Sequence, residues 1–272
     1  MKFDITASVV LYHNNREKLA QVVSSFLNTQ LSVKLILIDN SKTDDLKDLS
    51  SDPRVEYIFN NKNLGFGKAH NIALRESIET SKYHLVLNPD IYFNRGVLEE
   101  IYNFMEKEND IGQLMPKILY PDGQVQYLCK LLPTPFDLIF RRFLHFLPIA
   151  RKRNEIYELK GSGYNQIMNV PYLSGCFMFF RSSAINNIGF FDERIFMYIE
   201  DADITRRLHS RYRTVFYPYV HVYHHYAKGS YKSFKLMLFN IHGAFIYFTK
   251  WGWIFDSERV QINDRVLKNY LK

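Results

Sequence analysis

The sequence predicts an α/β fold with a mostly parallel central sheet flanked by helices. Short apolar segments alternate with amphipathic stretches over about the first hundred residues, which is the rhythm of strand–helix–strand units. The apolar segments are nearly continuous, as in Leu35-Ile36-Leu37-Ile38, and this is typical of parallel strands buried on both faces. With 272 residues, 47% of them hydrophobic, the chain can bury a core as one large or two closely packed domains.

The expected elements follow in chain order. We expect strands at residues 6–11, 34–38, 55–59 and 84–87, and helices at residues 17–27, 67–81 and 96–107. Residues 115–169 change in character and contain a hairpin signal, Tyr-Pro-Asp-Gly-Gln at 120–124, so an inserted, mobile region is expected there. A strand within residues 173–181 and a helix with an acidic start near residue 200 then resume the pattern.

Charge indicates an anionic partner without identifying it. The net charge is +7, and residues 204–255 contain eight Lys and Arg side chains but no Asp or Glu. A nucleotide, a diphosphate-linked lipid, an acidic membrane surface or a nucleic acid would each satisfy this excess. We expect no nucleic-acid binding, because no recognition motif is present and the loops around Asp39, Asp90 and Asp201 would repel phosphate without a metal.

The cysteines and the apolar runs suggest a cytoplasmic chain without a membrane-spanning helix. Cys129 and Cys176 have a spacing that fits neither a metal site nor a redox pair, so we expect two reduced, buried side chains. The first residues are typical of a strand and not of a signal peptide. The longest uncharged apolar run, residues 236–249, is interrupted by Asn240, His242 and Gly243 and is shorter than a bilayer span.

Polar residues follow each of the four expected strands, where parallel sheets bind their ligands. Asp39 suits a hydrogen bond to a base or ribose, although an Asx-turn through Asn40 and Ser41 is the alternative. Asp90, on the stiff Asn88-Pro-Asp turn, suits Mg²⁺ or Mn²⁺ shared with substrate phosphates, and a simple turn is its rival. The remaining strand ends carry Tyr12, His13 and Asn14, and residues 60–67.

The loop Asn-Lys-Asn-Leu-Gly-Phe-Gly-Lys-Ala-His-Asn at residues 61–71 has the features of a diphosphate site. Gly65 and Gly67 allow close backbone approach at a strand-to-helix junction, the helix start can hold an anion, and Lys68 adds a positive charge. The loop is neither a Walker loop nor a complete dinucleotide fingerprint.

An acidic cluster and a histidine cluster complete the candidate groups. Glu200, Asp201 and Asp203 follow an apolar entry at the expected start of a helix, where a carboxylate stays ionised and can accept a proton; an N-cap with an acidic first turn is the alternative. A neutral imidazole near a phosphate-bound metal is a plausible extra ligand. Among His221, His224 and His225 we favour His225, but spacing does not decide between the last two.

Taken in order, these segments resemble family 2 inverting glycosyltransferases with the GT-A fold, specifically the bacterial rhamnosyltransferase branch that builds O-antigen and cell-wall glycans. The resemblance covers about residues 5–235. The matching segments are Val9-Val-Leu-Tyr12, Ile38-Asp-Asn-Ser41, Asn63-Leu-Gly-Phe-Gly-Lys-Ala-His-Asn71, Leu87-Asn-Pro-Asp-Ile91, Ser174-Gly-Cys-Phe-Met178, Gly189-Phe-Phe-Asp-Glu193, Phe196-Met-Tyr-Ile-Glu-Asp-Ala-Asp203 and His225.

The resemblance implies a role for each candidate. Asp201 would be the catalytic base, with Glu200 and Asp203 on the acceptor side, and Asp90 with His225 would bind the metal, Mg²⁺ or Mn²⁺. Asn88 stands where the family usually has a first acid, so metal dependence is expected to be weaker. The residues implied on the donor side are Tyr12, Asp39 and Asn40, which include the base contact at Asp39, then Asn63, Gly65, Lys68 and Asn71 along the diphosphate, and Asn88 and Asp90.

The resemblance also suggests substrates and domain limits. The donor would be dTDP-rhamnose, with UDP-hexoses next, and a non-catalytic sugar-nucleotide-binding module is the rival reading. We expect a GT-A domain over residues 1–230, with a nucleotide-binding half (about 1–115) and an acceptor half (about 116–230), followed by a helical segment over 231–272.

Residues 232–255 mix aromatic and basic side chains, which suits a helix in the headgroup layer; packing on the catalytic domain or in a homodimer is the alternative. In the first case the acceptor would be a polyprenyl-diphosphate-linked glycan at the inner face of the cytoplasmic membrane, where the protein would be peripheral. Arg141, Arg142 and the basic run 151–153 would assist there.

Overall fold

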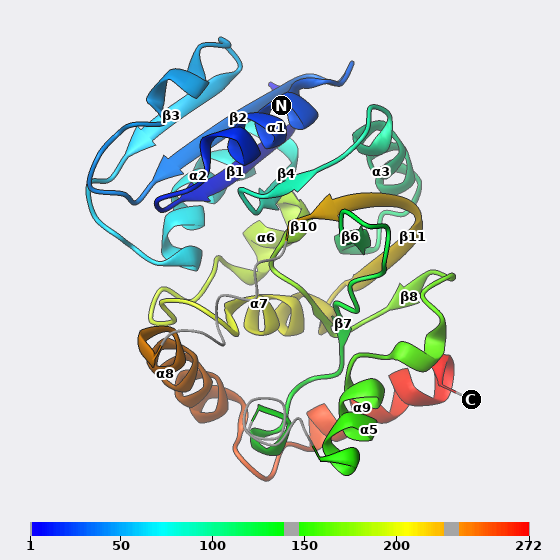
Figure 1. Cartoon of the computed structure of the whole chain (residues 1–272). Helices are drawn as coiled ribbons and strands as arrows, with labels where there is room; N and C mark the ends of the chain where they lie inside the picture. Colours follow the sequence, from blue (N-terminus) through cyan, green and yellow to red (C-terminus); the bar gives the residue numbers. More distant parts are fainter. Residues whose placement is uncertain (1, 139–146, 226–233, 272) are drawn as a thin grey trace.

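A nine-stranded, mostly parallel sheet forms the centre of the protein, as the sequence predicts (Figure 1). The structure is a computed structural model that describes residues 2–138, 147–225 and 234–271. The strand order is β3-β2-β1-β4-β10-β6-β11-β5, and β8 pairs with β11. The strands are β1 Phe3–Leu11, β2 Val33–Asp39, β3 Val55–Phe59, β4 Ser81–Leu87, β5 Ile91–Tyr92, β6 Ile111–Leu119, β8 Met168–Asn169, β10 Phe177–Arg181 and β11 Arg213–His224.

Helices cover this sheet, and a small two-stranded sheet lies beside it. The helices are α1 Arg16–Leu27, α2 Phe66–Thr80, α3 Val97–Lys107, α5 Pro148–Tyr157, α6 Ser182–Ile188, α7 Glu200–His209, α8 Phe234–Trp251 and α9 Ser257–Tyr270, with 3-10 turns at Lys47–Ser50 and Lys160–Ser162. The small sheet pairs β7 (Cys129–Lys130) with β9 (Tyr172–Leu173). Both cysteines are free and buried, as expected.

Four parallel strands, β3, β2, β1 and β4, bring the polar strand ends to one edge of the sheet. Leu11 is level with Asp39, and Asp39 is level with Phe59, so β1, β2 and β3 end together. The chain builds outward from β1 through β2 to β3 and then places β4 on the other side of β1. The boundary between β1 and β4 is therefore the topological switch point, where open α/β sheets bind ligands.

The second half of the sheet was predicted less well. The strand near residues 173–181 is confirmed as β10, which runs antiparallel between β4 and β6. The expectation of an inserted region over residues 115–169 is wrong at both ends of this span, where residues 115–119 belong to β6 and residues 168–169 form β8. Residues 139–146 of the span lie outside the described part. Gln113 and Pro116 interrupt the apolar pattern of β6, although the strand is buried. The hairpin turn at 120–124 is confirmed by the bond from Tyr120 N–H to the Gln124 carbonyl (2.8 Å).

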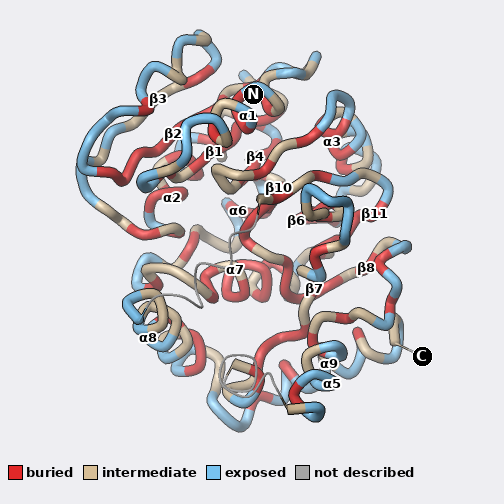
Figure 2. The backbone as a smooth tube through the Cα atoms, viewed as in Figure 1, coloured by how far each residue is buried: buried red, intermediate tan, exposed pale blue. Residues whose placement is uncertain are grey.

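The C-terminal helices pack beneath the sheet in the view of Figure 1. α8 contributes Tyr247 and Phe248 to an apolar cluster with Ile195, Ile199 and Ala202 around the start of α7. α7 is mostly buried between the sheet and these helices (Figure 2). In the part of the chain that the structure describes, no helix combines the length and apolar character needed to cross a membrane.

Candidate active site

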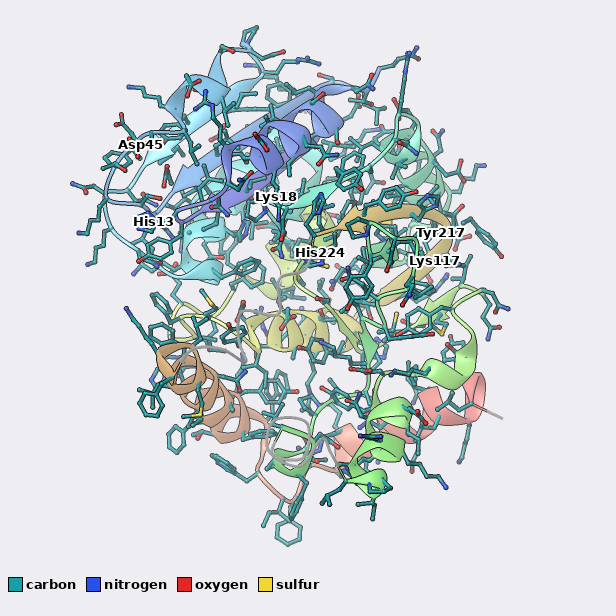
Figure 3. The ribbon with its side chains drawn as sticks, viewed as in Figure 1. His13, Lys18, Asp45, Lys117, Tyr217 and His224 are labelled. Carbon is teal, nitrogen blue, oxygen red and sulfur yellow. The ribbon has the colours of Figure 1, made fainter. Side chains whose placement is uncertain are left out.

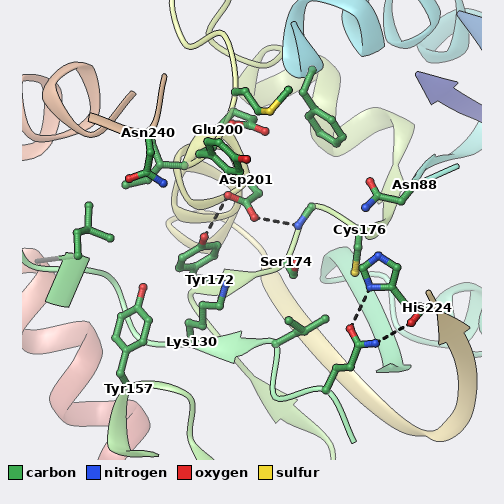
Figure 4. Close-up of a pocket in the computed structure, with 18 residues that line it drawn as sticks. Asn88, Lys130, Tyr157, Tyr172, Ser174, Cys176, Glu200, Asp201, His224 and Asn240 are labelled. Atoms are coloured by element: carbon green, nitrogen blue, oxygen red, sulfur yellow. Dashed lines mark hydrogen bonds between the residues drawn. The ribbon is translucent and has the colours of Figure 1, made fainter. Parts of the chain in front are cut away.

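A cavity of about 370 Å³ lies beside the switch point, between the start of α7, the small sheet and the end of β11. Glu200 and Asp201 stand on one wall, and Asn88 and His224 lie across it (Figure 4). Figure 3 places His224 near the centre of the molecule and Tyr217, earlier in β11, toward its outer edge. The other lining residues are Phe66, Gln126, Leu128, Lys130, Leu138, Tyr157, Tyr172, Ser174, Gly175, Cys176, Met197, Tyr198, Ile199 and Asn240.

Asp201 is held in one orientation at the first turn of α7. Its Oδ2 accepts a hydrogen bond from the Gly175 N–H (2.9 Å), and its Oδ1 accepts from the Tyr172 hydroxyl (3.2 Å) and the Ala202 N–H (2.9 Å). A Cβ at position 175 would lie only 3.2 Å from the Asp201 Cβ, so glycine permits this approach. The carboxylate is thus fixed at the cavity wall, in a position to accept a proton from a bound hydroxyl.

Glu200 differs from Asp201 in environment, although the two are adjacent. Its side chain is buried, and among the described residues Oε2 has no hydrogen-bond partner. Burial, and then the neighbouring Asp201 charge, raise the pKa of Glu200 well above its ordinary value. The environment of Glu200 therefore disfavours a negative charge on its own carboxyl group.

The backbone before α7 is strained. Tyr198 and Ile199 have φ values of 72° and 67°, a region that β-branched and bulky side chains rarely adopt and that costs about 1–3 kcal/mol per residue. α8 supports this turn closely, since a Cβ on Gly243 would lie 2.8 Å from the Tyr198 carbonyl oxygen. Such strain persists only where packing imposes it, and it is common at active sites.

Asp90 faces His224 and not the favoured His225. His224 Nε2 lies 3.3 Å from Asp90 Oδ1, whereas the His225 ring packs on Tyr92 with centroids 5.2 Å apart. His225 approaches Asp90 through its backbone, because its N–H donates to the Asp90 carbonyl (3.1 Å). Sequence spacing does not decide between His224 and His225 as the partner of Asp90. In the structure β11 ends at His224, and it is the His224 ring that faces Asp90.

Gln126 determines the tautomer of His224. Its Nε2 donates to the His224 carbonyl (2.9 Å), which fixes the amide so that Oε1 faces His224 Nδ1 at 2.9 Å (Figure 4). Nδ1 must therefore carry a proton, and in the neutral ring the lone pair of Nε2 points toward Asp90 Oδ1. Two acceptors 3.3 Å apart need a proton or a cation between them.

Asp90 Oδ1 and His224 Nε2 are suitable ligands for a divalent cation that also binds substrate. Asp90 Oδ1 is buried and accepts no hydrogen bond from the described residues, and a carboxylate oxygen with an imidazole nitrogen suits Mn²⁺. Within the described ranges, no three His, Cys, Asp or Glu side chains are grouped so that they could hold a metal ion. The remaining ligands would thus have to come from substrate phosphates or water.

The residues implied along the diphosphate are bound mainly to one another. Asn40 donates to the Gly65 carbonyl (3.2 Å) and to Asn63 (3.4 Å), and the Gly65 N–H donates to Asn63 (3.0 Å). Asn71 is buried and exchanges hydrogen bonds with the Phe191 backbone (3.0 Å each way). These contacts build the loop and join α2 to residues 189–193.

Lys68 and Gly65 show how this loop faces its surroundings. The Lys68 ammonium is about half exposed and lies 3.4 Å from Glu193, so it is available at the helix start. Gly65 has φ = 83°, and a Cβ there would lie 2.3 Å from the Phe196 carbonyl oxygen, to which the Phe66 N–H donates (2.9 Å). The loop is therefore docked against the segment that leads to Asp201.

Asp39 and Tyr12 lie at the ends of β2 and β1 and do not line the cavity. Asp39 is buried and accepts from the Ser41 N–H (2.7 Å), which is the Asx-turn alternative, and from the Tyr57 hydroxyl (2.5 Å). Burial, and then this bond, raise the pKa of Tyr57. Since β1 alone separates β2 from β4, the strands that precede Asp39 and Asp90 lie about 10 Å apart.

Asp203 does not reach the cavity, contrary to the expected acceptor contact. It is buried on the other side of α7 and accepts from Arg207 (2.9 Å), Lys250 (2.7 Å) and the Trp251 indole (2.8 Å). Its carboxylate thus joins α7 to α8. Two positions along a helix rotate a side chain by about 200°, which explains why Asp201 and Asp203 face opposite ways.

Several lining residues were missed because they lie in the span expected as an insertion. Gln126 and Lys130 lie in that span and Tyr172 just beyond it, and none of them carries a motif. The small sheet brings Lys130 and Tyr172 to the wall, and Gln126 is held there by its bonds to His224. Cys176 links the two carboxylates: burial raises the pKa of its thiol to about 12, and the charges of Asp90 and Asp201 both add to this. Asp201 lines the cavity, whereas Asp90 lies behind the lining residue His224.

An open α/β sheet with an oriented carboxylate in a cavity beside its switch point is the arrangement of an α/β enzyme that can take a proton from a bound substrate. The chain belongs to glycosyl transferase family 2, whose model matches residues 8–189. It is 28% identical over 249 residues to the N-acetylglucosaminyl-diphospho-decaprenol L-rhamnosyltransferase of Mycobacterium tuberculosis, covering 84% of this chain and 78% of that relative. Rhamnosyltransferase WbbL of Escherichia coli is 25% identical over 244 residues, with 86% and 88% covered.

Solved structures show the same fold. Staphylococcus aureus TarS superposes with a TM-score of 0.62 at 14% identity, over 98% of this chain and 43% of that one. The mannosyltransferase PcManGT from Pyrobaculum calidifontis, solved with GDP-Man and Mn²⁺, gives 0.55 at 15% identity, over 85% and 59%. The chain thus spans less than two thirds of either solved chain. The protein is a glycosyltransferase, and the GT-A fold is confirmed.

Proposed function

We propose that this glycosyltransferase moves an L-rhamnosyl group from dTDP-rhamnose to a hydroxyl of a polyprenyl-diphosphate-linked glycan, with inversion at the anomeric carbon. The observation that carries the proposal is Asp201, oriented by Gly175 and Tyr172 across one cavity from Asn88 and His224. The two rhamnosyltransferase relatives, each matched over more than four fifths of this chain, support the donor sugar. One of them is named for a decaprenol-diphosphate acceptor, which supports the lipid carrier.

Asp201 is the proposed base. A sugar hydroxyl is a weak nucleophile until a group removes its proton, and a carboxylate within hydrogen-bond reach can do so as the new bond forms. Attack from the face opposite the diphosphate inverts the anomeric carbon in one displacement, so a second, nucleophilic carboxylate is not needed. A protonated Glu200 would not compete for this role and would instead offer a hydrogen bond to the acceptor.

The donor is proposed to lie along the strand ends. Asp39, with Tyr12 and Asn40 beside it, would bind the base and ribose, and the 63–71 loop with Lys68 would bind the diphosphate at the start of α2. Asp90 and His224 would hold Mg²⁺ or Mn²⁺ beside Asn88. Such an ion neutralises charge on a leaving diphosphate.

The surface of α8 supports a peripheral position at the inner face of the cytoplasmic membrane. α8 packs on the catalytic domain through one side, which is the alternative expected for this segment, and its other side is apolar and exposed. The exposed side chains on α8 and just after it are Phe234, Leu238, Ile241, Phe245, Trp253, Ile254 and Phe255. Arg141, Arg142 and Lys232, also expected to help here, lie outside the described residues.

The proposed base is tested by Asp201→Asn. We expect transfer to fall by at least about 100-fold, because the amide cannot take the proton, while the fold and donor affinity persist. Transfer rate, thermal midpoint and donor binding should be measured together, with Asp264→Asn on the exposed side of α9 as the matched control. Transfer at the wild-type rate by Asp201→Asn would remove the proposed base.

Donor identity is tested by thermal stabilisation. A ligand that binds only the native state raises the midpoint, so dTDP-rhamnose should raise it more than UDP-hexoses do, and more with Mn²⁺ than without. Slow release of free sugar from the bound donor separates a transferase from a module that only binds sugar nucleotides. A larger shift with a UDP-hexose would reassign the donor.

A further inference from the structure

A second cavity, of about 600 Å³, lies between α5, α9 and the segment after β7. Its volume is within the range of about 300–1,000 Å³ typical of ligand sites. The interior is mainly aliphatic, unlike the polar cavity around Asp201. The apolar lining residues are Leu131, Leu132, Ile149, Ala150, Ile156 and Leu267.

Two sets of polar contacts join the walls of this cavity. The Asn263 amide of α9 exchanges hydrogen bonds with the Leu132 backbone (2.9 and 3.0 Å). Arg153 of α5 donates to the buried Asp137 (2.6 Å). Since these groups satisfy one another, the space between them presents aliphatic surface, and a ligand there would gain mainly from burial of hydrocarbon.

The cavity adjoins the active site at one end and the surface at the other. Tyr157, the last residue of α5, lines both cavities. Lys130 lies on the active-site side, with its ammonium 4.6 Å from the centre of the Tyr172 ring. At the outer end Ile149 is 71% exposed, and Lys152 adds a positive charge.

We propose that this second cavity binds the isoprenoid chain of the lipid-linked acceptor, at the units nearest the diphosphate. The inference rests on the proposed function and names a site for the tail of that substrate. Aliphatic walls fit isoprene units, and Lys130, on the active-site side, complements the diphosphate that joins the tail to the sugar. The shared wall at Tyr157 allows one molecule to place its sugar near Asp201 and its tail between α5 and α9.

The test fills the cavity with Ala150→Trp, at a buried position of α5. Two acceptors are compared, N-acetylglucosaminyl diphosphate carrying either a farnesyl or a methyl group. Because each buried methylene is worth about fourfold in affinity, wild-type KM should be at least about tenfold lower for the farnesyl acceptor. In Ala150→Trp this difference should vanish, while the KM for the methyl acceptor and donor hydrolysis stay unchanged. Val260→Trp, at an exposed position of α9, is the matched control.

A second readout separates this proposal from the proposed function. Farnesyl diphosphate binding, measured by titration calorimetry, requires no transfer, and it should weaken at least about tenfold in Ala150→Trp but not in Val260→Trp. If the wild type transferred sugar to neither acceptor, the proposed function would fall and calorimetry would still decide the site. Equal farnesyl affinity in wild type and a folded Ala150→Trp would overturn the isoprenoid site. Should Ala150→Trp not fold, Leu267→Glu provides the same comparison with a charge in the cavity.

Discussion

At the scale of single residues, the contact between Asp90 and His224 depends on a third side chain. Gln126 is buried and bonds to His224 twice, at the ring and at the backbone carbonyl. A side chain that orients a ligand commonly affects metal affinity almost as much as the ligand itself. His224 and Asp90 could be anticipated from the sequence, but Gln126 could not, because its role comes from the hairpin that returns it beside β11.

We therefore predict that Gln126→Leu weakens Mn²⁺ binding. The expected loss is about 10- to 100-fold, since the imidazole is no longer held in one tautomer and orientation. Electron paramagnetic resonance of free Mn²⁺, with the nucleoside diphosphate present, measures the affinity directly. Gln124→Leu, at an exposed position of the same hairpin, is the control. Unchanged affinity in Gln126→Leu would show that His224 needs no such support or binds no metal.

At the scale of elements, α7 joins the active site to the C-terminal helices through opposite faces. Asp201 faces the cavity, while Arg206 on the other side is buried and pairs with Asp256 through two hydrogen bonds (2.7 and 2.8 Å). Arg206 also lies over the Trp251 ring, 4.1 Å from its centre. Because Asp256 also caps α9 through the Arg259 N–H (2.9 Å), its carboxylate connects α7 to α9, and Arg206 connects α7 to α8.

We predict that Asp256→Ala destabilises the protein by about 3–5 kcal/mol, because it leaves the Arg206 guanidinium buried without its main partner. Urea unfolding measures the loss. Glu258→Ala removes the half-exposed partner of the same arginine, so its cost should be no more than about 1 kcal/mol. Equal losses in the two variants would mean that burial of the Arg206–Asp256 pair is not what matters.

How far the sequence predicted each element depends on the regularity of its pattern. The four parallel strands and the helices between them were expected within a few residues, because continuous apolar runs and amphipathic periodicity mark them. β6 and β11 were not expected, since Gln113, Pro116 and Pro218 break their patterns while the tertiary fold still buries much of them. The same holds for the candidate site. The residues in sequence motifs were predicted, whereas the wall formed by β7, β9 and Gln126 was not predicted.

At the scale of the whole molecule, most of the large apolar side chains left exposed lie on α8, the turn after it, α5 and α9. Those of α8 and the turn after it lie in the lower part of the molecule, as do α5 and α9 (Figure 1). Exposed apolar surface on this scale commonly marks an interaction site. Lys235, exposed on α8, would add attraction to anionic lipid.

We predict that the protein binds vesicles of phosphatidylethanolamine and phosphatidylglycerol, and that Leu238→Glu with Phe245→Glu lowers this binding by at least about tenfold. Both positions are exposed on α8, so the charges remove insertion without disturbing the core. Sedimentation with vesicles measures the binding. Phe59→Glu, at the exposed end of β3, is the control. Undiminished binding by the double variant would rule out α8 as the membrane contact.

At Gly65 the 63–71 loop packs directly against the segment that leads to Asp201. Any β-carbon there would collide with the Phe196 carbonyl, and the backbone beyond Phe196 leads within a few residues to Asp201. A methyl group added at Gly65 would thus push the segment that leads to Asp201, the proposed base. A loop redesigned for a new nucleotide sugar should therefore keep glycine at position 65. A larger residue there would shift the proposed base even if the new donor bound.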